Sequence, residues 1–183
     1  MEPDQLMAVT FTVREAAKDL IVANLVKPTL PSGDLLVYNA PDDLDPSGEG
    51  PVTLETFPTV IVQKGLYGEV DNWQRVTQAE VRYLWWLEII VYLAEEKLPS
   101  WEAQKLVEDW QTAVADVILA QPTLNGTVEE IVTEDNGNFM YTRDGFYDWY
   151  RQDTATPNSY WGIGFRMQVA QEYPFAETVG VSS

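Results

Sequence analysis

The chain has 183 residues, with 29 Asp and Glu against 11 Lys and Arg, which gives a formal net charge of −18 at pH 7. It contains no histidine and no cysteine, which excludes Ser-His-Asp triads, thiol nucleophiles, imidazole or thiolate metal sites and disulfides. The negative charge disfavours binding to DNA, RNA and anionic membranes, because phosphate contacts supply most nucleic-acid affinity. Hydrophobic residues make up 45% of the chain, enough for the packed core of one domain.

The N-terminal residues lack a basic segment followed by an apolar one, so we expect no signal peptide. The most apolar run, residues 81–94, carries Arg82 and Glu88 and is shorter than the roughly 20 residues that a membrane-spanning helix needs. We therefore expect a soluble protein. The excess charge has two interpretations of equal weight, solubility through mutual repulsion and a specific role.

The first quarter of the chain predicts a helix and a long loop. Thr12 and Glu15 have the spacing of a capping box, apolar residues follow at helical spacing, and Lys27-Pro28 ends the helix. Residues 28–58 hold six of the eleven prolines and predict a long surface loop with a short strand at 35–38.

The middle of the chain predicts two strands with a loop between them. Residues 59–63 are β-branched and apolar, and residues 64–77 are rich in glycine and polar residues. Residues 80–93 alternate between two largely apolar faces, which is typical of a strand that is covered on both sides.

The second half predicts one long helix and several strands. Residues 100–120 have an apolar stripe at helical spacing, with Ser100 as the expected N-cap. Residues 127–133 and 139–142 flank the Asn136-Gly137 turn signal of a hairpin. Residues 143–158 are predicted to be an aromatic loop, and residues 160–173 a strand with one buried face.

This order predicts the α+β class, with a mainly antiparallel β-sheet, a long helix and an N-terminal helix packed on one face, and extended loops or hairpin arms. Residues 1–175 are expected to form a single domain that includes the long loop insertion at 28–58 and the aromatic loop at 143–158. Residues 176–183 are expected to be a flexible C-terminal tail.

No motif predicts a catalytic, cofactor-binding or metal-binding residue. A P-loop is missing, and Gly162 and Gly164 fall inside a strand and not at a strand-to-helix turn. The acidic residues at 42–45 lack the spacing of a calcium loop, so a solvated loop is expected there. A carboxylate pair for glycoside hydrolysis stays open, but with so many carboxylates the sequence gives no signal for one.

Aromatic residues in turn-rich segments are the more informative feature, because such residues are enriched at protein interfaces. An equally weighted alternative is that they cover the edge of the core beneath their own loops. The candidate interface residues are Tyr67, Trp73, Phe146, Tyr147, Trp149 and Tyr150.

Five segments together resemble the tail terminator, or tail completion, proteins of long-tailed bacteriophages. They are REAAKDLIVANLV (14–26), FPTVIVQKG (57–65), VRYLWWLEIIVYLA (81–94), EAQKLVEDWQTAVADVILAQP (102–122) and YWGIGFRMQVAQEYPF (160–175). The resemblance rests on the order and character of the elements and covers most of residues 12–175.

The resemblance implies a structural, non-enzymatic virion protein without a cofactor that assembles as a homo-oligomer, a hexameric ring. Such a ring caps the tail tube, ends its polymerisation and joins the tail to the head, so its partners are the tail tube protein and a head-completion or neck protein. It assembles in the host cytoplasm and resides in the virion, at the neck on top of the tail.

Two physical expectations accompany the resemblance. The segment 64–77 is expected to contact a neighbouring subunit by strand pairing or aromatic anchoring. Part of the acidic surface is expected to face a lumen through which DNA passes without binding. The alternatives are another neck, connector or tail tube subunit, a monomeric acidic binding module, and a carboxylate-dependent enzyme.

Overall fold

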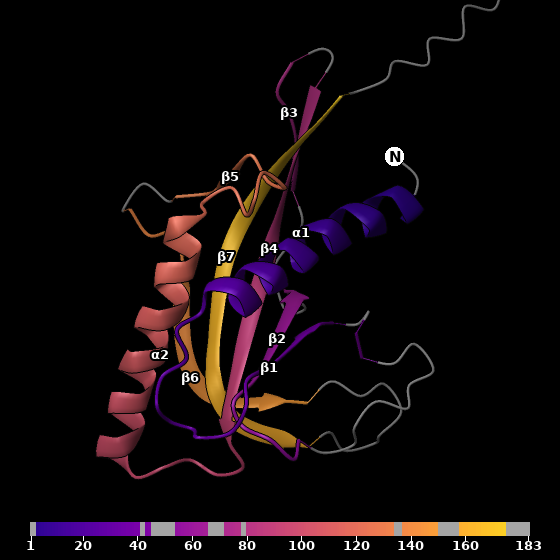
Figure 1. Cartoon of the computed structure of the whole chain (residues 1–183). Coiled ribbons are helices and arrows are strands. Elements are labelled where there is room, and N and C mark those ends of the chain that lie inside the picture. The colour runs from indigo at the N-terminus through magenta and orange to yellow at the C-terminus, as the bar shows by residue number, and fades with distance from the viewer. Residues whose placement is uncertain are drawn as a thin grey trace, which may run out of the picture.

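The computed structural model describes residues 3–40, 43–44, 54–65, 72–77, 80–133, 137–149 and 158–174. It confirms the predicted class, an α+β fold with two helices and a mostly antiparallel sheet (Figure 1). The helices are α1 (Pro3–Asn24) and α2 (Ser100–Ala120). The strands are β1 (Leu36–Asn39), β2 (Thr59–Lys64), β3 (Asn72–Arg75), β4 (Glu80–Ala94), β5 (Glu130–Ile131), β6 (Tyr141–Asp148) and β7 (Ser159–Pro174).

Two long antiparallel strands, β4 and β7, form the centre of the sheet. The order β1-β2-β4-β7-β5 runs across it, β3 pairs with β4 beyond the end of β2, and β6 pairs with β7 beside β5. Only the β1–β2 pair is parallel among the described strands. At about 3.3 Å per residue the 15 residues of β4 extend roughly 50 Å, so the centre of the sheet is elongated along the strand direction.

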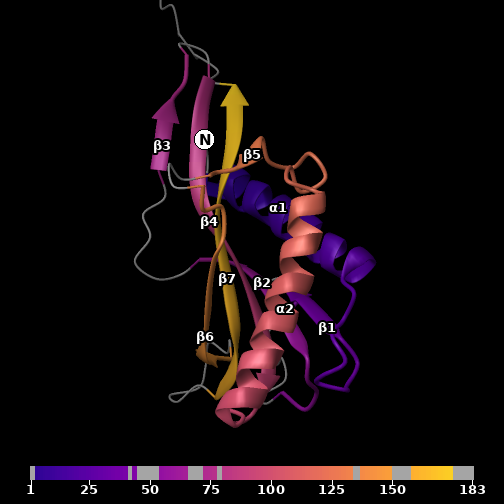
Figure 2. The same ribbon diagram turned by 90° about the vertical axis from the view of Figure 1, so that its left-hand side faces the viewer.

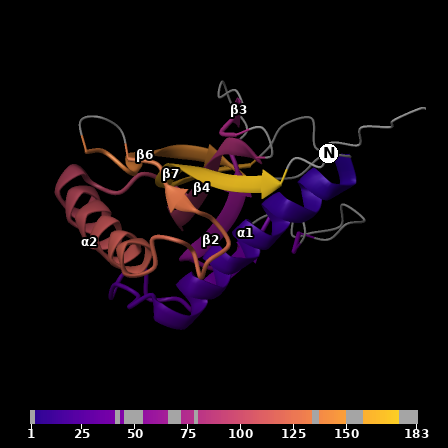
Figure 3. The ribbon, with the colours of Figure 1, turned by 90° about the horizontal axis from the view of Figure 1, so that it is seen from above.

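Both helices cover the same face of the sheet, as the view from above shows (Figure 3). The buried cluster on this helix face contains residues of both helices and the odd-numbered residues of β4 and β7, with Tyr83, Trp85, Trp110, Trp161 and Phe165 among the largest. The prediction that helices pack on one face is therefore confirmed. Six of the seven residues of the predicted α2 stripe are buried, and Val107 is partly buried against the core; the six are Ala103, Leu106, Trp110, Val114, Val117 and Ile118.

A second cluster covers part of the opposite face, which we call the outer face. It joins Ile61, Ile90 and Tyr92 of the sheet to Ala40, Leu44, Leu54, Trp149 and Tyr160. This second layer explains why the even-numbered residues of β4 are apolar and confirms that β4 is covered on both sides.

Beyond the helices, β3 and the ends of β4 and β7 continue as an arm of strands (Figures 1 and 2). The arm includes the antiparallel β3–β4 pair, so a hairpin arm lies where the sequence predicted a loop over 64–77. Trp73 of β3 stacks on Tyr83 of β4 with ring centroids 4.3 Å apart.

Helix α1 is fixed to the sheet by a buried arginine. The Arg14 side chain is 6% exposed and donates hydrogen bonds to Asn39 Oδ1 (2.8 Å), the Ala40 carbonyl and the Thr10 carbonyl. Nearby, Lys18 forms ion pairs with Glu15 and Asp43. Burial acts to raise the pKa of Asp43, but the hydrogen bonds that Asp43 accepts, above all from Lys18, lower this pKa below its usual value. These polar contacts join α1 to the end of β1.

Four sequence predictions need correction. The segments on either side of Asn136-Gly137 do not form a hairpin, because β5 and β6 both pair with β7 and the described strands include no β5–β6 pair. Helix α1 begins at Pro3, because proline suits the first helical position, and Thr12 is therefore inside the helix and not its N-cap. Ser100 is the first residue of α2, and Pro99 precedes it as N-cap. The segment 143–158 is not a loop throughout, because residues 141–148 pair with β7 as strand β6; residues 150–157 and the predicted tail at 176–183 lie outside the described residues.

Candidate functional site

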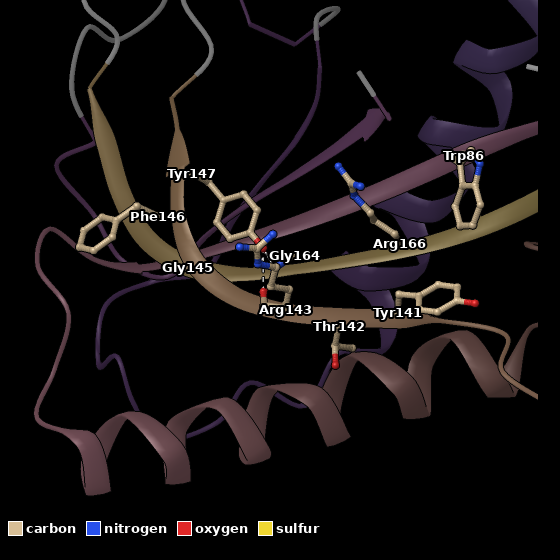
Figure 4. Close-up of a pocket in the computed structure, with 9 residues that line it drawn as sticks. All are labelled: Trp86, Tyr141, Thr142, Arg143, Gly145, Phe146, Tyr147, Gly164 and Arg166. Carbon is tan, nitrogen blue, oxygen red and sulfur yellow. Dashed lines mark hydrogen bonds between the residues drawn. The ribbon is translucent and has the colours of Figure 1, made fainter. Parts of the chain in front are cut away.

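A surface depression lies on the outer face, between edge strand β6 and the central strands. It is a groove of about 580 Å³ (Figure 4). We call it the aromatic groove; its lining residues are Trp86, Tyr141, Thr142, Arg143, Gly145, Phe146, Tyr147, Gly164 and Arg166.

The antiparallel register between β6 and β7 explains this composition. Tyr141 is opposite Arg166, Arg143 is opposite Gly164, and Gly145 is opposite Gly162. Because side chains alternate between faces along a strand, the odd-numbered residues of β6 share the outer face with the even-numbered residues of β7. Two opposed glycines and their neighbours therefore leave a hollow between larger side chains.

The floor of the groove depends on Gly164. The Tyr147 ring lies across this glycine, and its hydroxyl donates to the Arg143 carbonyl (2.7 Å) and accepts from the Gly164 N–H (3.0 Å). A Cβ at position 164 would lie 2.6 Å from the Tyr147 hydroxyl oxygen, so a larger residue here would displace the tyrosine side chain from the floor. Partial burial raises the pKa of Tyr147 above its ordinary value.

One wall of the groove is a charged row that crosses the sheet. Glu88 of β4 is 3% exposed, accepts a hydrogen bond from Arg166 Nε (2.8 Å) and accepts another from Gln63 Nε2 (2.7 Å). The strand register places Gln63, Glu88 and Arg166 side by side. The carboxylate is thus satisfied by neighbours on both sides, and the Arg166 guanidinium keeps part of its surface in the groove.

The groove is locally basic although the chain is strongly acidic. Arg143 and Arg166 contribute two positive charges, and Glu88 contributes one negative charge. Asp144 and Asp148 of β6 belong to the opposite set of alternating residues, opposite Ile163 and Ser159, and Asp144 lies 3.8 Å from Lys97. An anionic group that enters the groove therefore meets arginine donors and tyrosine rings.

The far end of the outer face, at the arm, has the opposite charge. Arg82 pairs with Glu129 (3.4 Å) and Glu130, and Glu80 and Glu172 lie beside it. Desolvation and the neighbouring Glu129 raise the pKa of Glu172, as expected where carboxylates crowd together. We call Glu80, Glu129, Glu130 and Glu172 the acidic end, in which four carboxylates face one guanidinium.

The structure places the predicted interface residues in different surroundings. Trp73, 44% exposed, lies on the arm, and Phe146, 57% exposed, lies on β6 with its ring directed away from Tyr147 (Figure 4). Of the six predicted interface residues, Phe146 and Tyr147 line the aromatic groove. Tyr67 and Tyr150 lie outside the described residues.

Trp149 requires a correction. It is 2% exposed and packs edge-on against Tyr92, with ring centroids 5.5 Å apart, and against Tyr38. Its side chain is therefore part of the second buried cluster, which matches the alternative that aromatics cover the core edge beneath their own loops. We do not retain it as an interface residue.

Sequence reasoning missed Trp86, Tyr141, Arg143 and Arg166 as groove residues. They come from three strands that are distant in the chain, and only the strand register brings them together. The one available signal was the Gly162 and Gly164 pair on the accessible face of β7, because glycine in a strand often marks a close approach.

The described residues offer little for metal or redox chemistry. None of them form a cluster of three or more His, Cys, Asp or Glu side chains suited to hold a metal ion. Neither described helix is long and apolar enough to cross a membrane. The chemistry that the groove supports is binding, through guanidinium hydrogen bonds and aromatic contacts.

Comparisons with known proteins do not assign this chain to a family. No protein-family model matches the chain, and a search of curated proteins gives no significant match. The function is therefore inferred from the fold, the charge distribution and the geometry of the outer face.

Proposed function

We propose that this protein is a structural virion subunit that forms a ring on top of a bacteriophage tail tube. The ring ends tube polymerisation and provides the surface that joins the tail to the head connector. In this proposal the partners are further copies of the chain, the tail tube protein and a head-completion or neck protein. The ring is proposed to be a homo-oligomer, a hexamer as the sequence resemblance implies.

The observation that carries the proposal is the free edge of β6. This strand has eight residues and pairs on one side with β7, and none of the described strands pairs with its other side. Long exposed edges are sites of intermolecular strand pairing, and soluble monomers usually block them. An edge of this length, with Tyr141 and Phe146 exposed on it, suits a protein that functions in an assembly.

The arm and the charge also support an assembly role. The β3–β4 pair extends beyond both helices and presents Trp73, so it can reach a neighbouring subunit without disturbing the core. The net charge of −18 suits a channel wall that lets DNA pass, because carboxylates repel phosphate.

The test is assembly in solution and on tubes. We expect rings in negative-stain images of the purified protein, alone at high concentration or on the ends of tail tubes. Adding the protein to polymerising tube subunits of a phage that encodes this chain should shorten the tubes. A monomer that neither forms rings nor binds tube ends would refute the proposal.

The aromatic groove favours one second candidate, a monomeric acidic binding module. Its arginines and tyrosines form a site for an anionic segment whether or not rings exist. A stable monomer that binds an acidic peptide in the groove and ignores tubes would support this candidate instead.

A further inference from the structure

We infer that the aromatic groove of one copy binds the acidic end of a second copy of this chain. The inference rests on the proposed function, because it assigns the contact between neighbouring subunits. It goes beyond that function by naming the two surfaces and the charges that join them.

The first step is that the two surfaces have opposite charge on the same face of one sheet. The groove carries two guanidiniums against one carboxylate, and the acidic end carries four carboxylates against one guanidinium. In a chain with 11 basic and 29 acidic residues, two arginines in one groove are a concentrated site for carboxylates.

The second step is that the two surfaces cannot satisfy each other within one chain. Arg166 and Glu172 are six positions apart on β7, which is roughly 20 Å along a strand. Both belong to the paired β4–β7 ladder and are held apart by it. This distance exceeds the Debye length of about 8 Å at physiological ionic strength, so the two charges are screened from each other.

The third step is that both surfaces are accessible. The acidic end consists of four exposed glutamates. Glu80 and Glu172 lie on the arm, which extends beyond the helices (Figure 2), and Glu129 and Glu130 lie at β5. Arg143 is exposed at the free edge of β6, and it has no ion-pair partner among the described residues. A glutamate of a second copy can therefore meet Arg143 without displacing an existing ion pair.

Charge complementarity also explains why a second copy is the occupant. Two chains of net charge −18 repel each other, so a contact that places the basic part of one copy against carboxylates of the other is favoured over other arrangements. The groove and the acidic end are different surfaces, and repeating such a contact from copy to copy generates a closed ring if the rotation closes.

Charge reversal in two separate variants tests the inference. Arg143→Glu makes the groove acidic, and Glu80→Lys combined with Glu172→Lys makes the acidic end basic. Each variant alone places like charges in contact, so each should be monomeric by sedimentation velocity at low salt, where the wild type is oligomeric. A one-to-one mixture restores opposite charges at every contact and should recover the wild-type mass.

The control is Lys105→Glu, which reverses one exposed charge on α2, away from the sheet, and should leave the wild-type mass unchanged. Circular dichroism checks that every variant is folded. Added salt should dissociate the wild-type oligomer, because it screens the contact.

The outcomes separate this inference from the proposed function. A mixture that stays monomeric, or a wild type that is monomeric through the millimolar range at low salt, overturns the inference. Rings that survive both charge reversals overturn it and leave the proposed function standing. Rescue by mixing that yields only dimers supports the contact and contradicts the ring.

Discussion

Replacing Trp149 by alanine tests whether this aromatic residue is core or interface. Its side chain is 2% exposed and fills the space between Tyr38 and Tyr92 in the second buried cluster. Truncating a buried Trp to Ala costs about 3–5 kcal/mol through lost transfer energy and the cavity left behind. A typical domain is stable by about 5–15 kcal/mol, so the loss is a large fraction of the total.

The assay is urea unfolding followed by far-ultraviolet circular dichroism. We expect the free energy of unfolding to fall by about 3–5 kcal/mol and the melting temperature to fall by about 10 °C. Trp149→Phe should lose much less, because the smaller ring keeps most contacts. The same measurement on a monomeric background, such as Arg143→Glu, separates folding from assembly.

Phe146→Ala is the matched control, because this aromatic residue is 57% exposed on the neighbouring strand. Its effect on unfolding should stay within about 0.5 kcal/mol, as for other surface substitutions. If Trp149→Ala cost less than about 1 kcal/mol while preserving the fold, the burial argument would be wrong.

Three further predictions concern the sheet. Gly162→Ala should destabilise the protein more than Gly164→Ala. A Cβ at position 162 would lie 2.2 Å from a backbone carbonyl oxygen, whereas a Cβ at position 164 would meet a tyrosine side chain that can move. Chemical denaturation of the two variants measures the difference. Arg166→Met should lower the free energy of unfolding by about 1–3 kcal/mol, because it leaves the buried Glu88 carboxylate with one partner. Adding Glu88→Gln should recover part of that loss, and purely additive losses would contradict the pairing. Burial raises the pKa of Tyr173 to about 12, so its contribution to stability is complete below pH 10 and is lost as the pH rises through 12. The Tyr173 hydroxyl is buried without a hydrogen-bond partner among the described residues, so Tyr173→Phe should be neutral or stabilising at pH 7. The same substitution should remove the loss of stability above pH 10, and melting temperatures measured across pH would detect this.

The periodic segments were predictable from the sequence because one physical signal dominates each of them. Alternation over residues 160–173 and apolar residues on both faces of 80–93 required long, covered strands, and both were confirmed as β7 and β4. The stripe of α2 identified its buried face for the same reason. The α+β class followed from the order of these elements.

Polar and short segments were predicted less well because their structure depends on distant partners. The middle of strand β6, Arg143, Asp144 and Gly145, has weak strand propensity, so the sequence did not show that the strand continues through it to Asp148 along β7. Trp149 looked like a loop aromatic because its neighbours in sequence are polar, whereas its burial comes from Tyr38 and Tyr92.

The sequence by itself determined the acidic, histidine-free and cysteine-free chemistry, the two long strands and the amphipathic long helix, because composition and periodicity are local properties. Tertiary structure alone decided where the few positive charges lie. Register across β4, β7 and β6 places Arg143 and Arg166 in one groove and the carboxylates of the acidic end about 20 Å away. Register depends on pairing between residues far apart in the chain, so a count of charges cannot reveal it.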